Sequence, residues 1–132
     1  MKYYKLLFLC ALGLLINCKS VNTISSTQII ESTENSITLD VKAANPEYVA
    51  VNQLLFRGFP NSNQTIPLIS TSEIEIQKLF PTYFKDLFQS NRYKSFITSS
   101  SKNLNGSHRI TINLKAIRLD LEQNSIIRKF GY

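Results

Sequence analysis

The side chains most often used in catalysis and metal binding are few in this chain and lie far apart. His108 is the single histidine and stands beside a turn signal, so it is not expected to hold a metal. Glu73 and Glu75, like Asp120 and Glu122, are two residues apart, a spacing that points them in different directions on a helix. No glycine-rich phosphate loop or Gly-x-Ser-x-Gly elbow occurs. The sequence therefore predicts no catalytic residue, no metal site and no cofactor.

Cys18 is the one reactive residue in an informative setting. Lys2 and Lys5 open the chain, an uninterrupted apolar run fills residues 6–16, and polar sequence follows Cys18. As a helix that run would rise about 16 Å, whereas the hydrocarbon core of a bilayer is about 30 Å thick. A basic start, a short apolar run and a polar continuation indicate a secretory signal peptide rather than a transmembrane span.

The end of this segment, Leu15-Ile16-Asn17-Cys18, resembles the lipobox of bacterial lipoproteins. The resemblance implies cleavage just before Cys18, diacylation of its thiol and acylation of the new amino terminus, with palmitate-like chains. Asn17 departs from the Gly, Ala or Ser that is commoner there. Lys19 stands where Asp tends to retain enterobacterial lipoproteins in the inner membrane, so the resemblance implies the outer membrane, facing the periplasm or the surface. An ordinary signal peptide and an uncleaved anchor are the alternatives.

The cysteine content agrees with this interpretation. Cys10 lies within the segment that would be removed, so the mature body would contain no disulfide and no thiolate nucleophile. Two or three acyl chains anchor a protein stably where one does not. The body also resembles short uncharacterised lipoproteins of Bacteroidota, a group that implies no activity, in the stretches LLFRGFP (54–60), TYFKDLF (82–88), RYKSFI (92–97) and IRLDLEQNSIIRKFG (117–131).

The composition after Cys18 predicts three parts. Residues 1–17 are the predicted lipoprotein signal peptide. Residues 18–36 are expected to be the acylated cysteine and a flexible tether, because Ser, Thr and Asn dominate them. Residues 37–132 are long enough for a single α+β domain with a modest core.

Apolar periodicity predicts the elements of that domain. An Asn-Pro-Glu start, a serine capping box and an Asn-Gly turn mark two helix starts and a hairpin. The predicted strands are residues 37–43, 93–98 and 108–116, and the predicted helices are residues 46–56, 73–88 with a break at Pro81, and 117–124. The order β-α-α-β-β-α favours a small three-stranded, mostly antiparallel sheet with helices on one face.

The charge of the chain is uneven. Its formal net charge is +6. Residues 18–91 hold five basic and seven acidic residues, whereas residues 92–132 hold eight basic and two acidic ones. Such asymmetry indicates a face for anionic partners. The candidate surface consists of Arg109, Lys115, Lys94 and Lys42, and a solvated basic surface without a partner is the alternative.

The expected function is that of a lipid-anchored cell-envelope protein that acts by binding, as an adaptor or accessory subunit. Its expected partners are the membrane, an envelope protein complex or an anionic headgroup, and nucleic acid is not expected outside the cytoplasm. The alternative is an envelope enzyme acting on glycan or lipid, with distant carboxylates such as Asp40 and Glu47 assembled as a pair.

Overall fold

The computed structural model describes residues 25–129. The predicted signal peptide and Cys18 lie outside the described residues. The elements in chain order are β1 (Ser26–Ser32), β2 (Ser36–Lys42), α2 (Pro46–Phe56), α3 (Glu73–Leu79), α4 (Pro81–Phe84), the π-helical turn η2 (Lys85–Gln89), the 3-10 helix η3 (Arg92–Phe96), β3 (Ile97–Lys102), β4 (His108–Asn113) and α5 (Leu114–Gln123). No helix within this range is long and apolar enough to span a bilayer.

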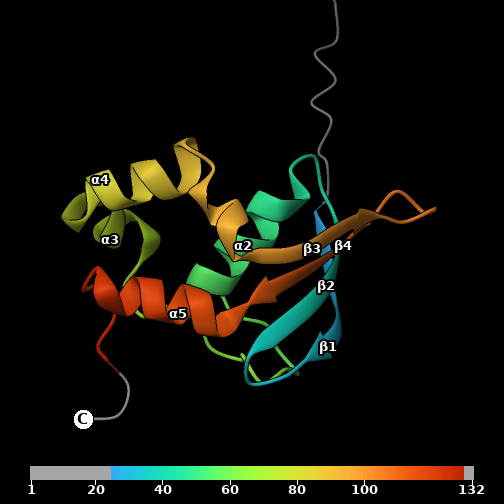
Figure 1. Cartoon of the computed structure of the whole chain (residues 1–132), viewed down its shortest axis with the longest axis horizontal. Helices are drawn as coiled ribbons and strands as arrows, with labels where there is room; N and C mark the ends of the chain where they lie inside the picture. The colour runs from blue at the N-terminus through green and yellow to red at the C-terminus, as the bar shows by residue number, and fades with distance from the viewer. Residues whose placement is uncertain (1–24, 130–132) are drawn as a thin grey trace, which may run out of the picture.

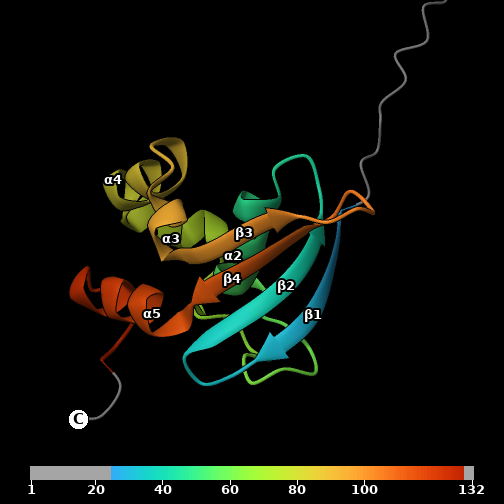
Figure 2. The same ribbon diagram turned by 45° about the vertical axis from the view of Figure 1, so that its right-hand side comes forward.

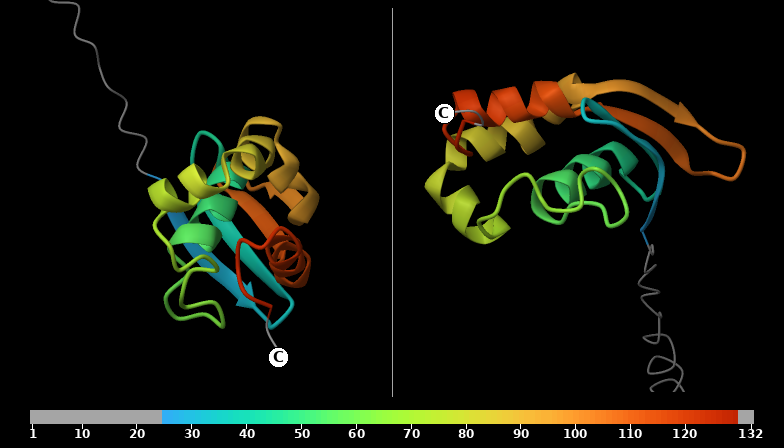
Figure 3. Two further views of the ribbon diagram at one scale, coloured as in Figure 1. Left: turned by 90° about the vertical axis from the view of Figure 1, so that its left-hand side faces the viewer. Right: turned by 90° about the horizontal axis from the view of Figure 1, so that it is seen from below.

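The α+β class predicted from the sequence is confirmed, but the sheet has four strands and not three. The strands are antiparallel and lie in the order β1-β2-β4-β3, so β1 and β3 form the two edges. The helices gather against one face of this sheet, as the end-on view shows (Figure 3). Among residues 25–129, no helix covers the other face of the sheet (Figures 1 and 2).

The central strands β2 and β4 position the core. Ile37, Leu39 and Val41 alternate along β2 and are fully buried, as are Ile110 and Ile112 opposite them on β4. Since side chains alternate between the faces of a strand, the intervening polar residues of both strands lie on the uncovered face. The alternation that predicted a half-buried strand at residue 37 therefore predicted the correct inner face.

The prediction that residues up to 36 form a flexible tether is wrong for the part that the structure describes. Ser26–Ser32 pairs with β2 as an edge strand, with Ile29 opposite Leu39. Thr33 closes the hairpin, because its hydroxyl accepts a hydrogen bond from the Ser36 amide at 3.0 Å. An edge strand needs few apolar residues, so its polar composition resembles that of a linker. Residues 26–36, predicted to be tether, therefore belong to the folded domain.

Two predicted strand boundaries are also wrong. Tyr93 and Phe96 are both buried, three residues apart, and this spacing places them on one side of the 3-10 helix η3 and not on a strand. At the other end of the hairpin, β4 stops at Asn113, whose side-chain oxygen accepts from the Ala116 amide at 2.9 Å and caps α5. Residues 114–116 are therefore helical, and the outward strand position predicted for Lys115 is wrong.

Two of the three predicted helix starts are confirmed, and the third helix, predicted from residue 117, begins at Leu114 instead. Asn45 caps α2 and Pro46 occupies its first turn, while Ser72 caps α3 by accepting from the Glu75 amide. Pro81 divides the second predicted helix into α3 and α4, as expected from its missing amide donor. The aromatic residues that follow pack on α2, with the rings of Tyr48 and Phe88 5.1 Å apart between their centroids.

Gly58 ends α2 in a left-handed conformation that places its backbone against a distant loop. Its φ angle is +73°, and a Cβ at this position would lie 2.5 Å from the carbonyl oxygen of Thr65. Gly106, in the β3–β4 turn, also has a positive φ of +82°, but a Cβ there would meet nothing within 4 Å. Both glycines have a positive φ, but only Gly58 is closely packed, so a comparison of the two distinguishes backbone strain from steric overlap.

Replacing Gly58 with Ala should lower the free energy of unfolding by about 3 kcal/mol, because steric overlap adds to left-handed strain. The matched control Gly106→Ala should lose only about 1 kcal/mol, from strain alone. Urea denaturation followed by circular dichroism measures both values. Equal losses in the two variants would contradict the close packing of Gly58.

Candidate functional site

The four residues of the predicted anionic-partner surface lie on four different elements. Arg109 lies on β4, Lys115 on α5, Lys94 on η3 and Lys42 at the end of β2. Two of them have acidic partners within the domain. The guanidinium of Arg109 is 3.0 Å from both carboxylate oxygens of Asp40, and Lys94 lies 3.6 Å from Glu47. Within residues 25–129, Lys42 and Lys115 are the members of the set that form no ion pair, and both are exposed.

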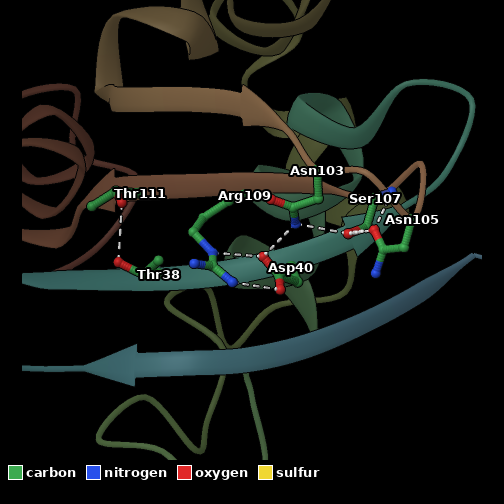
Figure 4. A network of polar contacts seen from close by, with 7 residues as sticks. All are labelled: Thr38, Asp40, Asn103, Asn105, Ser107, Arg109 and Thr111. Atoms are coloured by element: carbon green, nitrogen blue, oxygen red, sulfur yellow. Dashed lines mark hydrogen bonds and ion pairs between the residues drawn. The ribbon is translucent and has the colours of Figure 1, made fainter.

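The Asp40–Arg109 pair is the centre of a polar network on the uncovered sheet face (Figure 4). Asn103, at the end of β3, donates to Asp40 at 3.2 Å and to the Ser107 hydroxyl at 2.9 Å. Farther along the same strands, the hydroxyls of Thr38 and Thr111 are 3.0 Å apart. These bonds join β2, β4 and the β3–β4 hairpin, so the polar face is held in one arrangement before any partner binds.

The hydrogen bonds of this network favour the ionised form of Asp40. The hydrogen bond from Arg109 lowers the pKa of the Asp40 carboxyl against the opposing effect of burial, and the bond from Asn103 lowers it further. Asp40 is therefore ionised at neutral pH. Its charge is matched by Arg109, so the pair presents a fixed dipole and not a free positive charge to an approaching partner.

A groove of about 630 Å³ lies beside α4 and the end of α5, and sequence reasoning did not find it. Arg92 lies at its wall, with Nη1 2.9 Å from Asp120 and Nε bonded to Asp86. The Tyr83 hydroxyl donates to the second oxygen of Asp120 at 2.6 Å, and the guanidinium of Arg92 stacks over the Tyr83 ring at 5.0 Å. These residues come from four elements, so no local motif could have predicted their contact.

The geometry of this cluster favours a structural role over acid–base chemistry. Burial, and next the hydrogen bond to Asp120, raise the pKa of Tyr83, so its hydroxyl stays protonated at neutral pH. Both carboxylates that contact Arg92 are held by its single positive charge. The cluster fastens α5 to α4 and η3 and can offer hydrogen bonds along the groove.

The other residues considered for catalysis or metal binding do not come together in one site. Asp40 and Glu47, the pair named for a possible glycosidase, are each bound to a different cation. His108 begins β4, and its Nδ1 is buried without a hydrogen-bond partner among the described residues. Within residues 25–129, no group of three His, Cys, Asp or Glu residues is placed to hold a metal ion.

No protein-family model, curated protein or solved structure matches this chain. The function of the chain is therefore inferred from its own sequence and structure. The strongest features are the segment that ends in Cys18, the uncovered polar sheet face and the Arg92 groove.

Asp120→Ala should lower the free energy of unfolding by about 2 kcal/mol, because Tyr83 and Arg92 both lose a charged hydrogen-bond partner. Asp86→Ala, a matched control on the exposed side of Arg92, should lose at most about 0.5 kcal/mol. Thermal and urea denaturation of the two variants test the difference. The structural role of Asp120 is contradicted if both substitutions have the same small effect.

The Asp40–Arg109 pair should make stability depend on pH. Since the pKa of Asp40 is lower in the folded state than in the unfolded chain, its contribution is present at neutral pH and is lost as the pH falls below about 4. The difference in unfolding free energy between wild type and Asp40→Asn should therefore shrink as the pH is lowered from about 7 to about 3, a range that crosses the usual carboxyl pKa. Urea midpoints at several pH values measure it, and a constant difference would refute the linkage.

Proposed function

We propose that this chain is a lipid-anchored cell-envelope protein whose folded domain acts by binding, as an adaptor or accessory subunit. The observation that carries the proposal is the short apolar segment ending in Leu15-Ile16-Asn17-Cys18 directly before a polar stretch. Acylation at Cys18 would give a stable anchor, because two or three acyl chains hold a protein on a bilayer. The likeness of this segment to the lipobox of bacterial lipoproteins, with Lys19 after the cysteine, favours the outer membrane.

The extent of the fold supports a domain held close to the bilayer. Residue 25 is the first residue that the structure describes, and six residues lie between it and Cys18. The seven Cα–Cα steps from Cys18 to residue 25 span at most about 25 Å when fully extended. A partner of this domain would therefore be met at the membrane surface, which fits an accessory subunit of an envelope complex.

The uncovered face of the sheet supports a binding role. Its polar side chains are already joined by the Asp40–Arg109 and Thr38–Thr111 contacts, so a partner would meet an ordered surface. Edge strand β3 adds exposed serines at positions 99, 100 and 101 and pairs on one side only. An open strand edge beside an ordered polar face is a common way to receive a protein segment.

Binding is favoured over the alternative of an enzyme acting on glycan or lipid. The pKa values of five groups are displaced, namely Asp40, Tyr48, Tyr83, Arg92 and Arg109. All of them except Tyr48 belong to the Asp40–Arg109 pair or to the Arg92 cluster. In both clusters these groups are already bonded to partners within the domain. An active site usually leaves a displaced group free to act on substrate, whereas these contacts serve the fold.

Replacing Cys18 with Ala should abolish labelling of the protein by an alkyne analogue of palmitate in cells, because the acylated thiol is removed. Cys10→Ala is the matched control and should label as strongly as wild type, since Cys10 lies in the segment that would be cleaved. In-gel fluorescence measures both. Labelling that survives in Cys18→Ala but is lost in Cys10→Ala would overturn the assignment.

Cross-linking in cells tests the adaptor role separately. A carboxyl-terminally tagged chain should enrich a defined envelope complex from membranes, as measured by quantitative mass spectrometry. Enrichment should fall more than ten-fold with Cys18→Ala, because the domain leaves the bilayer. Acylated wild-type protein that enriches no envelope component would contradict the adaptor role while leaving the anchor intact.

A further inference from the structure

One end of the sheet brings together the start of the domain and two exposed lysines. In the strand register, Ser26 at the start of β1 pairs with Lys42, and Lys102 at the end of β3 pairs with His108. Figure 2 shows the beginning of β1, the end of β2 and the β3–β4 hairpin at this same end. We name this group, Lys42, Lys102 and the hairpin turn through Leu104, the hairpin end.

Leu104 is the most exposed large apolar side chain among the described residues. It stands at the tip of the β3–β4 hairpin, which projects beyond the helices (Figure 3). The turn is fixed from below, because Asn103 donates to both Asp40 and Ser107 and accepts from the Gly106 amide. Leu104 therefore points outward from an ordered turn and contributes no buried apolar surface to the folded domain.

The charges of the sheet are polarised along its strands. Lys42 and Lys102 are exposed at the hairpin end, and the nearby carboxylate of Asp40 is already held by Arg109. The exposed acidic residues Glu31 and Glu34 lie at the opposite end, around the β1–β2 turn. The opposite end also carries basic residues, because Arg118 of α5 donates to the Glu34 carbonyl at 3.4 Å and the exposed Lys115 lies at the start of the same helix. An anionic surface would therefore attract the hairpin end more strongly than the opposite end, where charges of both signs meet.

The position of Cys18 makes the bilayer the anionic surface that the hairpin end would meet. The first described strand, β1, starts at the hairpin end, and the seven Cα–Cα steps from residue 25 back to Cys18 span at most about 25 Å. A lipid at Cys18 would hold this end beside the bilayer at a high effective concentration, where weak contacts suffice.

We propose that the hairpin end docks on anionic phospholipid, with Leu104 entering the headgroup region and Lys42 and Lys102 contacting lipid phosphates. This inference rests on the proposed lipid anchor. It adds an orientation: the hairpin end faces the bilayer, and the β1–β2 turn and the Arg92 groove face away. Partners are then met on the parts of the domain that remain exposed.

The test uses the acylated full chain with Leu104→Cys, labelled with a polarity-sensitive fluorophore. After processing, Cys18 would be acylated and Cys10 removed, so position 104 would carry the sole free thiol. The protein is reconstituted into vesicles of phosphatidylcholine with phosphatidylglycerol that contain a spin-labelled lipid quencher. Ile74→Cys, an exposed apolar position on α3, is the matched control.

The fluorophore at position 104 should shift to the blue and be quenched, while the one at position 74 should report water. Lys42→Glu with Lys102→Glu should lower the ratio of docked to free hairpin by more than ten-fold, because each lysine near an anionic surface contributes roughly five-fold. Lys78→Glu with Lys85→Glu changes the net charge equally on α3 and η2 and should leave the ratio unchanged.

Two failures can be told apart. If the purified chain carries no acyl group, the proposed anchor fails. If the chain is acylated and floats with the vesicles but the fluorophore at position 104 reports water, the docking proposal fails and the anchor stands. Equal effects of the two lysine pairs would also overturn the proposal, because they would indicate a response to net charge alone.

Discussion

The structure depends on the burial of one face of the β2–β4 strand pair. Five aliphatic side chains of these strands are fully buried, and only helices laid across that face can cover them. α2 supplies Ala50, Val51, Leu54 and Leu55 to this core, and α5 supplies Leu114, Ile117 and Leu121. Because a shift of one residue in register would turn the buried set outward, this burial also fixes the register of the sheet. The positions of the polar residues follow from it.

That register has consequences on the uncovered face. It sets Asp40 opposite Arg109 and Thr38 opposite Thr111, and it brings Asn103 of the hairpin within reach of Asp40. Arg109, a member of the predicted anionic-partner surface, is therefore matched by a carboxylate. The same register places Lys42, Lys102 and the start of β1 at one end.

Local patterns predicted what local forces determine. The Asn45 and Ser72 caps, the break at Pro81 and the hairpin around Asn105-Gly106 each depend on a few neighbouring residues, and all were predicted. β1 was missed because a polar edge strand is stabilised by pairing with β2 and has almost no apolar pattern of its own. The Arg92 cluster was missed because Tyr83, Asp86 and Asp120 meet only after η3 and α5 have packed. The acidic partners of Arg109 and Lys94 could not be predicted either, because Asp40 and Glu47 lie far from them in the sequence.

The central claim is that Cys18 carries the membrane anchor, and the mass of the amino-terminal peptide tests it most directly. The protein should be purified from membranes of its native cells, digested and analysed by mass spectrometry. The account predicts a terminal peptide that begins at Cys18 and carries two or three acyl chains. A peptide that begins at Met1, or one that contains Cys18 as a free thiol, would contradict the anchor and with it the membrane-bound adaptor.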